Sequence, residues 1–156
     1  MKIKILAVGN KMPRWVSDGY QEYSKRMPRE MSLELIEIAP GNRGKNADIL
    51  RAIKKESDAI LAHVEKQDYV IALEVKGKNW TTEKLASNME SWQMSGQTVV
   101  LLVGGPEGLS ESCRVRANQQ WSLSALTLPH PVVRIVLAEQ IYRAWSVTQN
   151  HPYHRS

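Results

Sequence analysis

The sequence predicts a single α/β domain built around a parallel sheet. Five apolar runs rich in β-branched residues, four of them expected strands, alternate with segments of helical periodicity, which is the order of elements in parallel α/β folds. The run at 98–103 (TVVLLV) is continuously apolar, as expected of a central strand that is buried on both faces. A length of 156 residues is typical of one domain, and no repeat or linker divides it, so residues 1–156 are expected to fold together.

Each element follows from its local pattern. The expected strands are residues 2–8, 32–38, 69–75 and 98–103, and the expected helices are residues 14–26, 46–65, 81–96, 110–119 and 131–148. Asn46 is placed as the N-cap of the second helix, and Thr81 or Thr82 opens the third. The first half of 131–148 is rich in β-branched residues, so a strand is the alternative there. Residues 121–130 (WSLSALTLPH) form an uncharged loop in which Ser and Thr alternate with apolar residues.

The charge of the chain is concentrated near its C-terminus. Residues 112–156 contain five arginines and one glutamate, whereas residues 1–111 contain 16 basic and 15 acidic residues. This asymmetry favours an anionic partner, with nucleic acid first, although a solubilising surface explains it equally well. The N-terminal residues alternate charged with apolar side chains, unlike a signal peptide, and no apolar run is long enough to span a membrane. We therefore expect a cytoplasmic protein with no membrane partner.

Metal and disulfide chemistry are not expected. One cysteine, Cys113, excludes an internal disulfide and a cysteine-based metal site. His151 and His154 lie three residues apart, but no cysteine or carboxylate near them completes a set of three or four ligands. We therefore expect no metal.

The first of two glycine-containing turns does not match a P-loop. The turn at 41–46 (GNRGKN) has Ala39 where the first glycine would be, and Asn46 replaces the Ser or Thr that binds Mg²⁺. ATP hydrolysis is therefore not expected. Arg43 and Lys45 remain candidates for contact with phosphates, and a solvated basic loop is the alternative.

The second turn, at 104–108 (GGPEG), directly follows a buried strand. Ligands of open α/β sheets bind at the carboxyl ends of strands, and three glycines in five residues indicate a close approach to the backbone. A dinucleotide-dependent enzyme is one interpretation, but the G-x-G-x-x-G fingerprint and its acidic partner residue are missing. A ligand-free turn is the other alternative.

Five segments together resemble a known family. They are VGNKMPRWV (8–16), GNRGKNAD (41–48), LLVGGPEGLS (101–110), WSLSALTLPHPVVR (121–134) and YRAW…NHPYHR (142–155). Across the whole chain these residues resemble the ribosomal large subunit methyltransferase H family of the SPOUT superfamily. The resemblance implies S-adenosyl-L-methionine-dependent methylation at N3 of pseudouridine 1915, in helix 69 of 23S rRNA, on the assembled ribosome. It also implies a homodimer and a C-terminal deep trefoil knot.

The resemblance further implies where the cofactor binds. The implied residues are Leu73, Gly104, Leu123, Ser124, Ala125, Leu126, Thr127 and Leu128. Apolar residues interleaved with hydroxyls suit a cofactor that needs backbone donors and acceptors within an apolar slot.

The implied catalytic residues lie on the C-terminal tail. They are Tyr153, His154 and Arg155, which would complete the site across the dimer, and His130 is a further candidate as proton acceptor. Arg134 and Arg143 are candidates for contact with the RNA backbone, and a salt bridge to Glu139 is the alternative for either. A non-catalytic rRNA-binding or ribosome assembly protein is the rival function.

Overall fold

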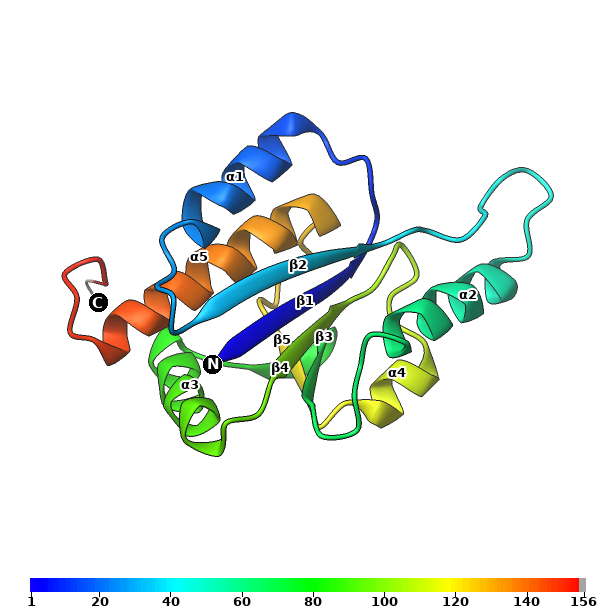
Figure 1. Cartoon of the computed structure of the whole chain (residues 1–156). Coiled ribbons are helices and arrows are strands. Elements are labelled where there is room, and N and C mark those ends of the chain that lie inside the picture. The colour runs from blue at the N-terminus through cyan, green and yellow to red at the C-terminus, as the bar shows by residue number, and fades with distance from the viewer. Residues whose placement is uncertain (155–156) are drawn as a thin grey trace.

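The computed structural model describes residues 1–154, and its centre is a five-stranded parallel sheet (Figure 1). The strands are β1 (Lys2–Val8), β2 (Ser32–Ile38), β3 (Tyr69–Asn79), β4 (Val99–Val103) and β5 (Gln119–Ser122). They lie in the order β2-β1-β4-β3-β5, and each neighbouring pair is parallel. The predicted α/β class with a parallel sheet is confirmed.

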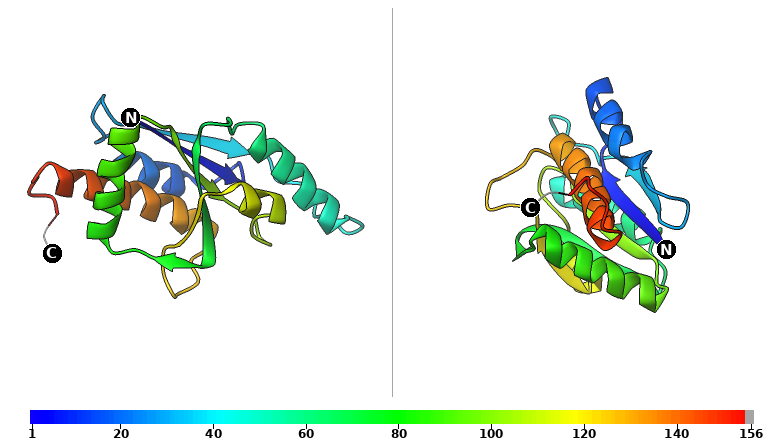
Figure 2. Two further views of the ribbon diagram at one scale, coloured as in Figure 1. Left: turned by 90° about the horizontal axis from the view of Figure 1, so that it is seen from below. Right: turned by 90° about the vertical axis from the view of Figure 1, so that its left-hand side faces the viewer.

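Helices cover both faces of this sheet, which gives three layers (Figures 1 and 2). They are α1 (Arg14–Ser24), α2 (Ile49–Leu61), α3 (Thr82–Ser95), α4 (Glu111–Arg116) and α5 (His130–Thr148). Helices α1, α3 and α5 share one apolar core with the sheet, and α2 and α4 share the other. No helix within residues 1–154 is long and apolar enough to cross a membrane.

Strand β4 shows why the sheet is buried on both sides. Val99, Leu101 and Val103 belong to the core under α1, α3 and α5, whereas Val100 and Leu102 belong to the core under α2 and α4. All five residues are buried, which confirms the prediction of a central strand.

One helix boundary, one alternative and one strand differ from the sequence-based predictions. Helix α2 begins at Ile49, because the carboxylate of Asp48 accepts the Arg51 N–H at 3.2 Å, so Asp48 and not Asn46 is the N-cap. Residues 130–148 form a helix throughout, and the alternative of a strand there is wrong. Strand β5 was not expected, because two of its four residues are glutamines and only pairing with β3 makes them a strand.

A bulge in β3 shapes the edge of the sheet next to β5. Leu73 and Lys78 both pair with Trp121, so the residues between them leave the ladder. The predicted strand 69–75 was expected to end within this bulge, whereas β3 continues to Asn79. It turns Glu74 and Val75 toward the cavity described next.

Candidate functional site

A cavity of about 630 Å³ opens at the carboxyl edge of the sheet. It lies where β1, β4 and β5 end and beside the bulge in β3, near the carboxyl edge at which open α/β sheets bind ligands. Its volume is in the range of small-molecule sites. The lining residues come from five segments of the chain: residues 8–10 and 12, residue 40, residues 73–75, residues 103–106 and 108, and residues 121–124, 126–130 and 133.

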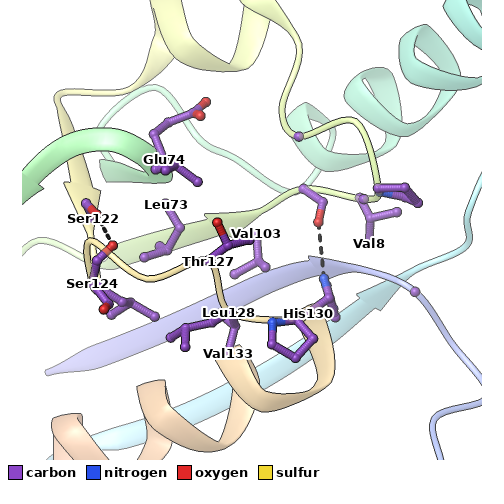
Figure 3. A pocket seen from close by; sticks show the side chains of 18 of the residues that line it. Val8, Leu73, Glu74, Val103, Ser122, Ser124, Thr127, Leu128, His130 and Val133 are labelled. Carbon is purple, nitrogen blue, oxygen red and sulfur yellow. Dashed lines mark hydrogen bonds between the residues drawn. The ribbon is translucent and has the colours of Figure 1, made fainter.

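The walls of the cavity are mostly apolar. Leu73 beside the β3 bulge and Val103 at the end of β4 face Leu128 and Val133, which lie on the loop after β5 and on α5 (Figure 3). Such walls exclude water from a bound ligand and strengthen any polar contact made inside.

The glycine-rich loop (residues 104–108) forms one rim of the cavity and folds tightly on itself. A Cβ at Gly104 would lie 2.5 Å from the carbonyl carbon of Gly108, a separation that forces the backbone to move. Gly108 has φ +82°, and its N–H donates to the Gly105 carbonyl at 2.9 Å. The glycines are therefore required by the loop itself, before any ligand is considered.

The polar groups at the cavity are few. The Ser122 hydroxyl donates to the Ser124 carbonyl at 3.0 Å, and the Ser124 hydroxyl accepts the Leu126 N–H at 2.9 Å, so both serines shape the loop. Glu74 supplies a carboxylate at the edge (Figure 3). No lysine or arginine is among the described residues that line the cavity.

His130 lies at the cavity with both ring nitrogens engaged. Its Nε2 accepts from Arg134 Nε at 3.0 Å, which leaves Nδ1 to carry the proton and donate to the Gly104 carbonyl at 3.1 Å. Burial, and then the nearby Arg134 charge, lower the pKa of His130. The ring is thus neutral and holds the glycine-rich loop, so its lone pair is not free to accept a proton from a substrate.

Arg134 does not fit the predicted contact with RNA backbone. Its side chain is 2% exposed, and it donates to Glu37 Oε2 at 2.6 Å and to the Gly9 carbonyl at 2.7 Å as well as to His130. The alternative salt bridge to Glu139 is wrong for this residue, because Arg134 pairs with Glu37 instead. Arg134 instead ties β2, the loop after β1 and α5 together beside the cavity.

The other three RNA candidates differ from one another. Arg43 is half-buried in ion pairs with Glu56 and Glu107, whereas Lys45 is exposed. Arg143 pairs with Glu139 at 2.7 Å, which is the structural alternative considered for it. Of the three, Lys45 alone keeps the exposure expected of a phosphate contact.

The C-terminal tail packs on the helices, away from the cavity of the same chain. The Tyr153 hydroxyl donates to Glu139 at 2.9 Å, and the ring lies 4.9 Å from the Arg143 guanidinium. Burial, and then the hydrogen bond to Glu139, raise the pKa of Tyr153 to about 12, so the phenol stays protonated at neutral pH. His154 Nε2 lies 3.5 Å from Glu83 on α3, and Arg155 lies outside the described residues. Thus Tyr153 and His154 do not meet His130 within one chain.

The cavity brings together most residues expected to bind the cofactor. Leu73, Gly104, Leu123, Ser124, Leu126, Thr127 and Leu128 line it, and Ala125 is not among its lining residues. The residues that sequence reasoning missed are those on the loops after β1 and β2 and on the β3 bulge: Gly9, Asn10, Met12, Pro40, Glu74 and Val75. The rule that ligands bind at carboxyl ends of strands would have indicated the first loop, because residues 9–13 directly follow a strand. Within residues 1–154, no group of three His, Cys, Asp or Glu side chains is arranged to hold a metal ion.

Two comparisons with known proteins agree with this architecture. A family model described as a predicted SPOUT methyltransferase matches residues 1–154. A solved structure, a probable methylase family protein from Haemophilus influenzae Rd KW20, superposes with a TM-score of 0.57 at 11% sequence identity. The match covers 99% of this chain and 70% of that chain. At this identity the likeness establishes the fold.

Proposed function

This chain belongs to the SPOUT methyltransferase family, and on that premise we propose that it methylates ribosomal RNA with S-adenosyl-L-methionine as the methyl donor. The proposed target is N3 of pseudouridine 1915 in helix 69 of 23S rRNA, on the assembled ribosome. The five segments that resemble the ribosomal large subunit methyltransferase H family support this target, since they span the chain from residue 8 to residue 155.

The composition of the cavity carries the proposal for the cofactor. A dinucleotide would bring two phosphates, yet no lysine or arginine within residues 1–154 lines the cavity, and Pro106 removes one backbone donor. The Glu74 carboxylate, which also lies 3.5 Å from Arg114 Nη1, stands beside apolar walls and backbone groups, a lining that suits an adenosine with a cationic side arm instead. When bound, S-adenosylmethionine supplies a methyl group on a positively charged sulfur.

The residues of the chain then position the reactants and exclude water. The glycine-rich loop and residues 122–128 offer backbone donors and acceptors, and Leu73, Val103 and Leu128 form the apolar walls. His130 fixes the Gly104 carbonyl, as described above. Methyl transfer between well-aligned groups needs little more than such positioning, apart from removal of the imino proton of the base.

We propose that a second copy of the chain completes the site. Within one chain Tyr153 is held at Glu139, nine residues and about 14 Å along α5 from His130. Val132, Ile135 and Val136 on α5 are only half-buried, although apolar, and a homodimer would cover them. The tail of one copy, including Tyr153, His154 and Arg155, would then reach the cavity of the other. The family also implies a deep trefoil knot at the C-terminal half, which we include in the proposal.

Methylation of purified ribosomes tests the function. Ribosomes from a strain that lacks the modification are incubated with the protein and S-adenosylmethionine, and the 23S fragment containing position 1915 is analysed by mass spectrometry. We expect one added methyl group at that position, and calorimetry should show binding of S-adenosylmethionine but not of NAD. Ribosome binding without methyl transfer would favour the non-catalytic rRNA-binding alternative, and methylation at another position would overturn the proposed target.

A further inference from the structure

The ion-pair network around Arg43 joins three separate segments next to the cavity. Arg43 lies on the loop between β2 and α2, Glu56 on α2, and Glu107 on the glycine-rich loop. Because the glycine-rich loop forms a rim of the cavity, whatever holds Glu107 also holds part of that rim.

One side of the network is a buried anchor. The Glu56 side chain is 4% exposed, and its carboxylate accepts the Gly41 N–H at 2.7 Å and both terminal nitrogens of the Arg43 guanidinium. Burial alone would raise the pKa of Glu56, but the hydrogen bonds from Arg43 and Gly41 outweigh it and lower the pKa. Glu56 therefore fixes the position and plane of the guanidinium.

The other side of the network reaches the glycine-rich loop. Arg43 Nη2 lies 2.8 Å and Nε 2.9 Å from Glu107 Oε1, so two nitrogens of one rigid plane hold this carboxylate. Gly105 lies under the same network, since a Cβ there would be 3.3 Å from Arg43 Nη2 and 3.4 Å from Glu56 Oε1.

From this geometry we infer that Arg43 is a positioning residue that, anchored on Glu56, holds Glu107 and thereby fixes the glycine-rich loop in the shape that lines the cavity. Its contribution to cofactor affinity rests on the proposed function, whereas its hold on the loop does not. Arg43 is therefore not available as a phosphate contact, the role that its place in a basic turn suggested.

Neutralising Glu107 gives the sharpest test. The Glu107 side chain is 32% exposed, so Glu107→Gln breaks the ion pair with Arg43 without leaving a buried charge. Loss of Arg43, in contrast, would leave the buried Glu56 carboxylate without its ion-pair partner. Glu34→Gln is the matched control, because Glu34 forms a 3.1 Å ion pair with Lys2 on β1 and does not line the cavity. Arg43→Lys keeps the charge but loses the rigid fork, and we expect it to behave like Glu107→Gln.

Two measurements separate the inference from the proposed function. Amide hydrogen exchange without any cofactor reports on the loop, and we expect the Gly108 amide to exchange about tenfold faster in Glu107→Gln and at the wild-type rate in Glu34→Gln. Calorimetry with S-adenosylmethionine should show affinity about tenfold weaker in Glu107→Gln, with a Tm close to that of the control.

Each outcome decides one of the two ideas. Unchanged exchange at Gly108 would overturn the inference. Faster exchange with wild-type affinity would overturn the role in cofactor binding. No binding of S-adenosylmethionine by the wild-type protein would overturn the proposed function. The exchange rate of the Gly108 amide would still test whether Arg43 holds the glycine-rich loop through Glu107.

Discussion

Replacement of Arg134 by methionine separates a structural role from RNA contact at this residue. The guanidinium donates to Glu37, the Gly9 carbonyl and His130 and is almost completely buried, so the substitution removes three charge-assisted hydrogen bonds at once. Each such bond contributes roughly 1.5–3 kcal/mol, but Glu37 is 41% exposed and recovers hydration, and methionine refills most of the volume. We expect the free energy of unfolding to fall by about 3 kcal/mol, close to the 3–5 kcal/mol typical of breaking a buried pair.

Urea denaturation of Arg134→Met beside Arg143→Met measures this effect. Arg143 is more exposed and pairs with Glu139 on the same helix, so its loss is expected to cost less than about 1 kcal/mol. For a chain of this size, a loss of 3 kcal/mol corresponds to a fall in Tm of about 10 °C. If Arg134→Met were as stable as Arg143→Met but bound ribosomes more weakly, our reasoning would be refuted and RNA contact would be the better explanation.

Four further substitutions or deletions test other parts of the site. The pKa of His130 is lowered in the folded protein, so the stability that its neutral ring contributes is complete above pH 6.5 and is lost as pH falls below that value. The free energy of unfolding, measured from pH 7.5 to 5.5, should therefore fall more steeply in the wild type than in His130→Asn. Glu74→Gln should weaken S-adenosylmethionine binding several-fold more than S-adenosylhomocysteine binding in calorimetry, because only the former carries a sulfonium charge; equal losses would place Glu74 away from the sulfur. Val132→Asp charges the half-buried face of α5 and should give monomers in sedimentation experiments, whereas an intact dimer would exclude this face as the interface. Deletion of residues 153–156 should abolish methylation of ribosomes while S-adenosylmethionine affinity stays within about twofold, and full methylation by the shortened protein would remove the tail from the site.

The sequence pattern predicts the layers of this fold well, because burial dictates them directly. A run such as 98–103 is apolar on both faces only if helices cover both faces, and the third helix ends where Gly96 takes φ +72°. The pattern does not predict β5, since Gln119 and Gln120 have no strand periodicity and become a strand through hydrogen bonds to β3. Pairing with β3 therefore makes residues 119–122 a strand, which their own strand propensity does not predict.

In the candidate site, too, the features that depend on neighbouring residues were predictable from the sequence, and those that depend on residues far apart in the chain were not. The composition of the glycine-rich loop marked it as a candidate ligand site, whereas residues 123–128 were assigned to the cofactor through the family resemblance. Seven of the eight residues expected to bind the cofactor line the cavity. The roles of Arg43 and Arg134 were not recognisable, because each is determined by carboxylates far away in the chain. Glu107 lies 64 residues from Arg43, and Glu37 lies 97 residues from Arg134. A basic residue in a sequence looks the same whether it faces a phosphate or a buried carboxylate.

The position of the C-terminal tail shows that motifs close together in the sequence need not lie close together in the folded chain. Residues 121–134 and 142–155 belong to one set of motifs, yet α5 runs between their outer ends for 19 residues, or about 28 Å. The tail returns along α5 only as far as Glu139, where the Tyr153 hydroxyl is bound, and His154 turns to Glu83 on α3. A rigid helix cannot shorten this separation, so Tyr153 reaches a cavity only by leaving Glu139 or by meeting the cavity of another copy. The second route keeps every contact that the tail makes with its own chain, and for this reason our proposal places the completed site between two subunits.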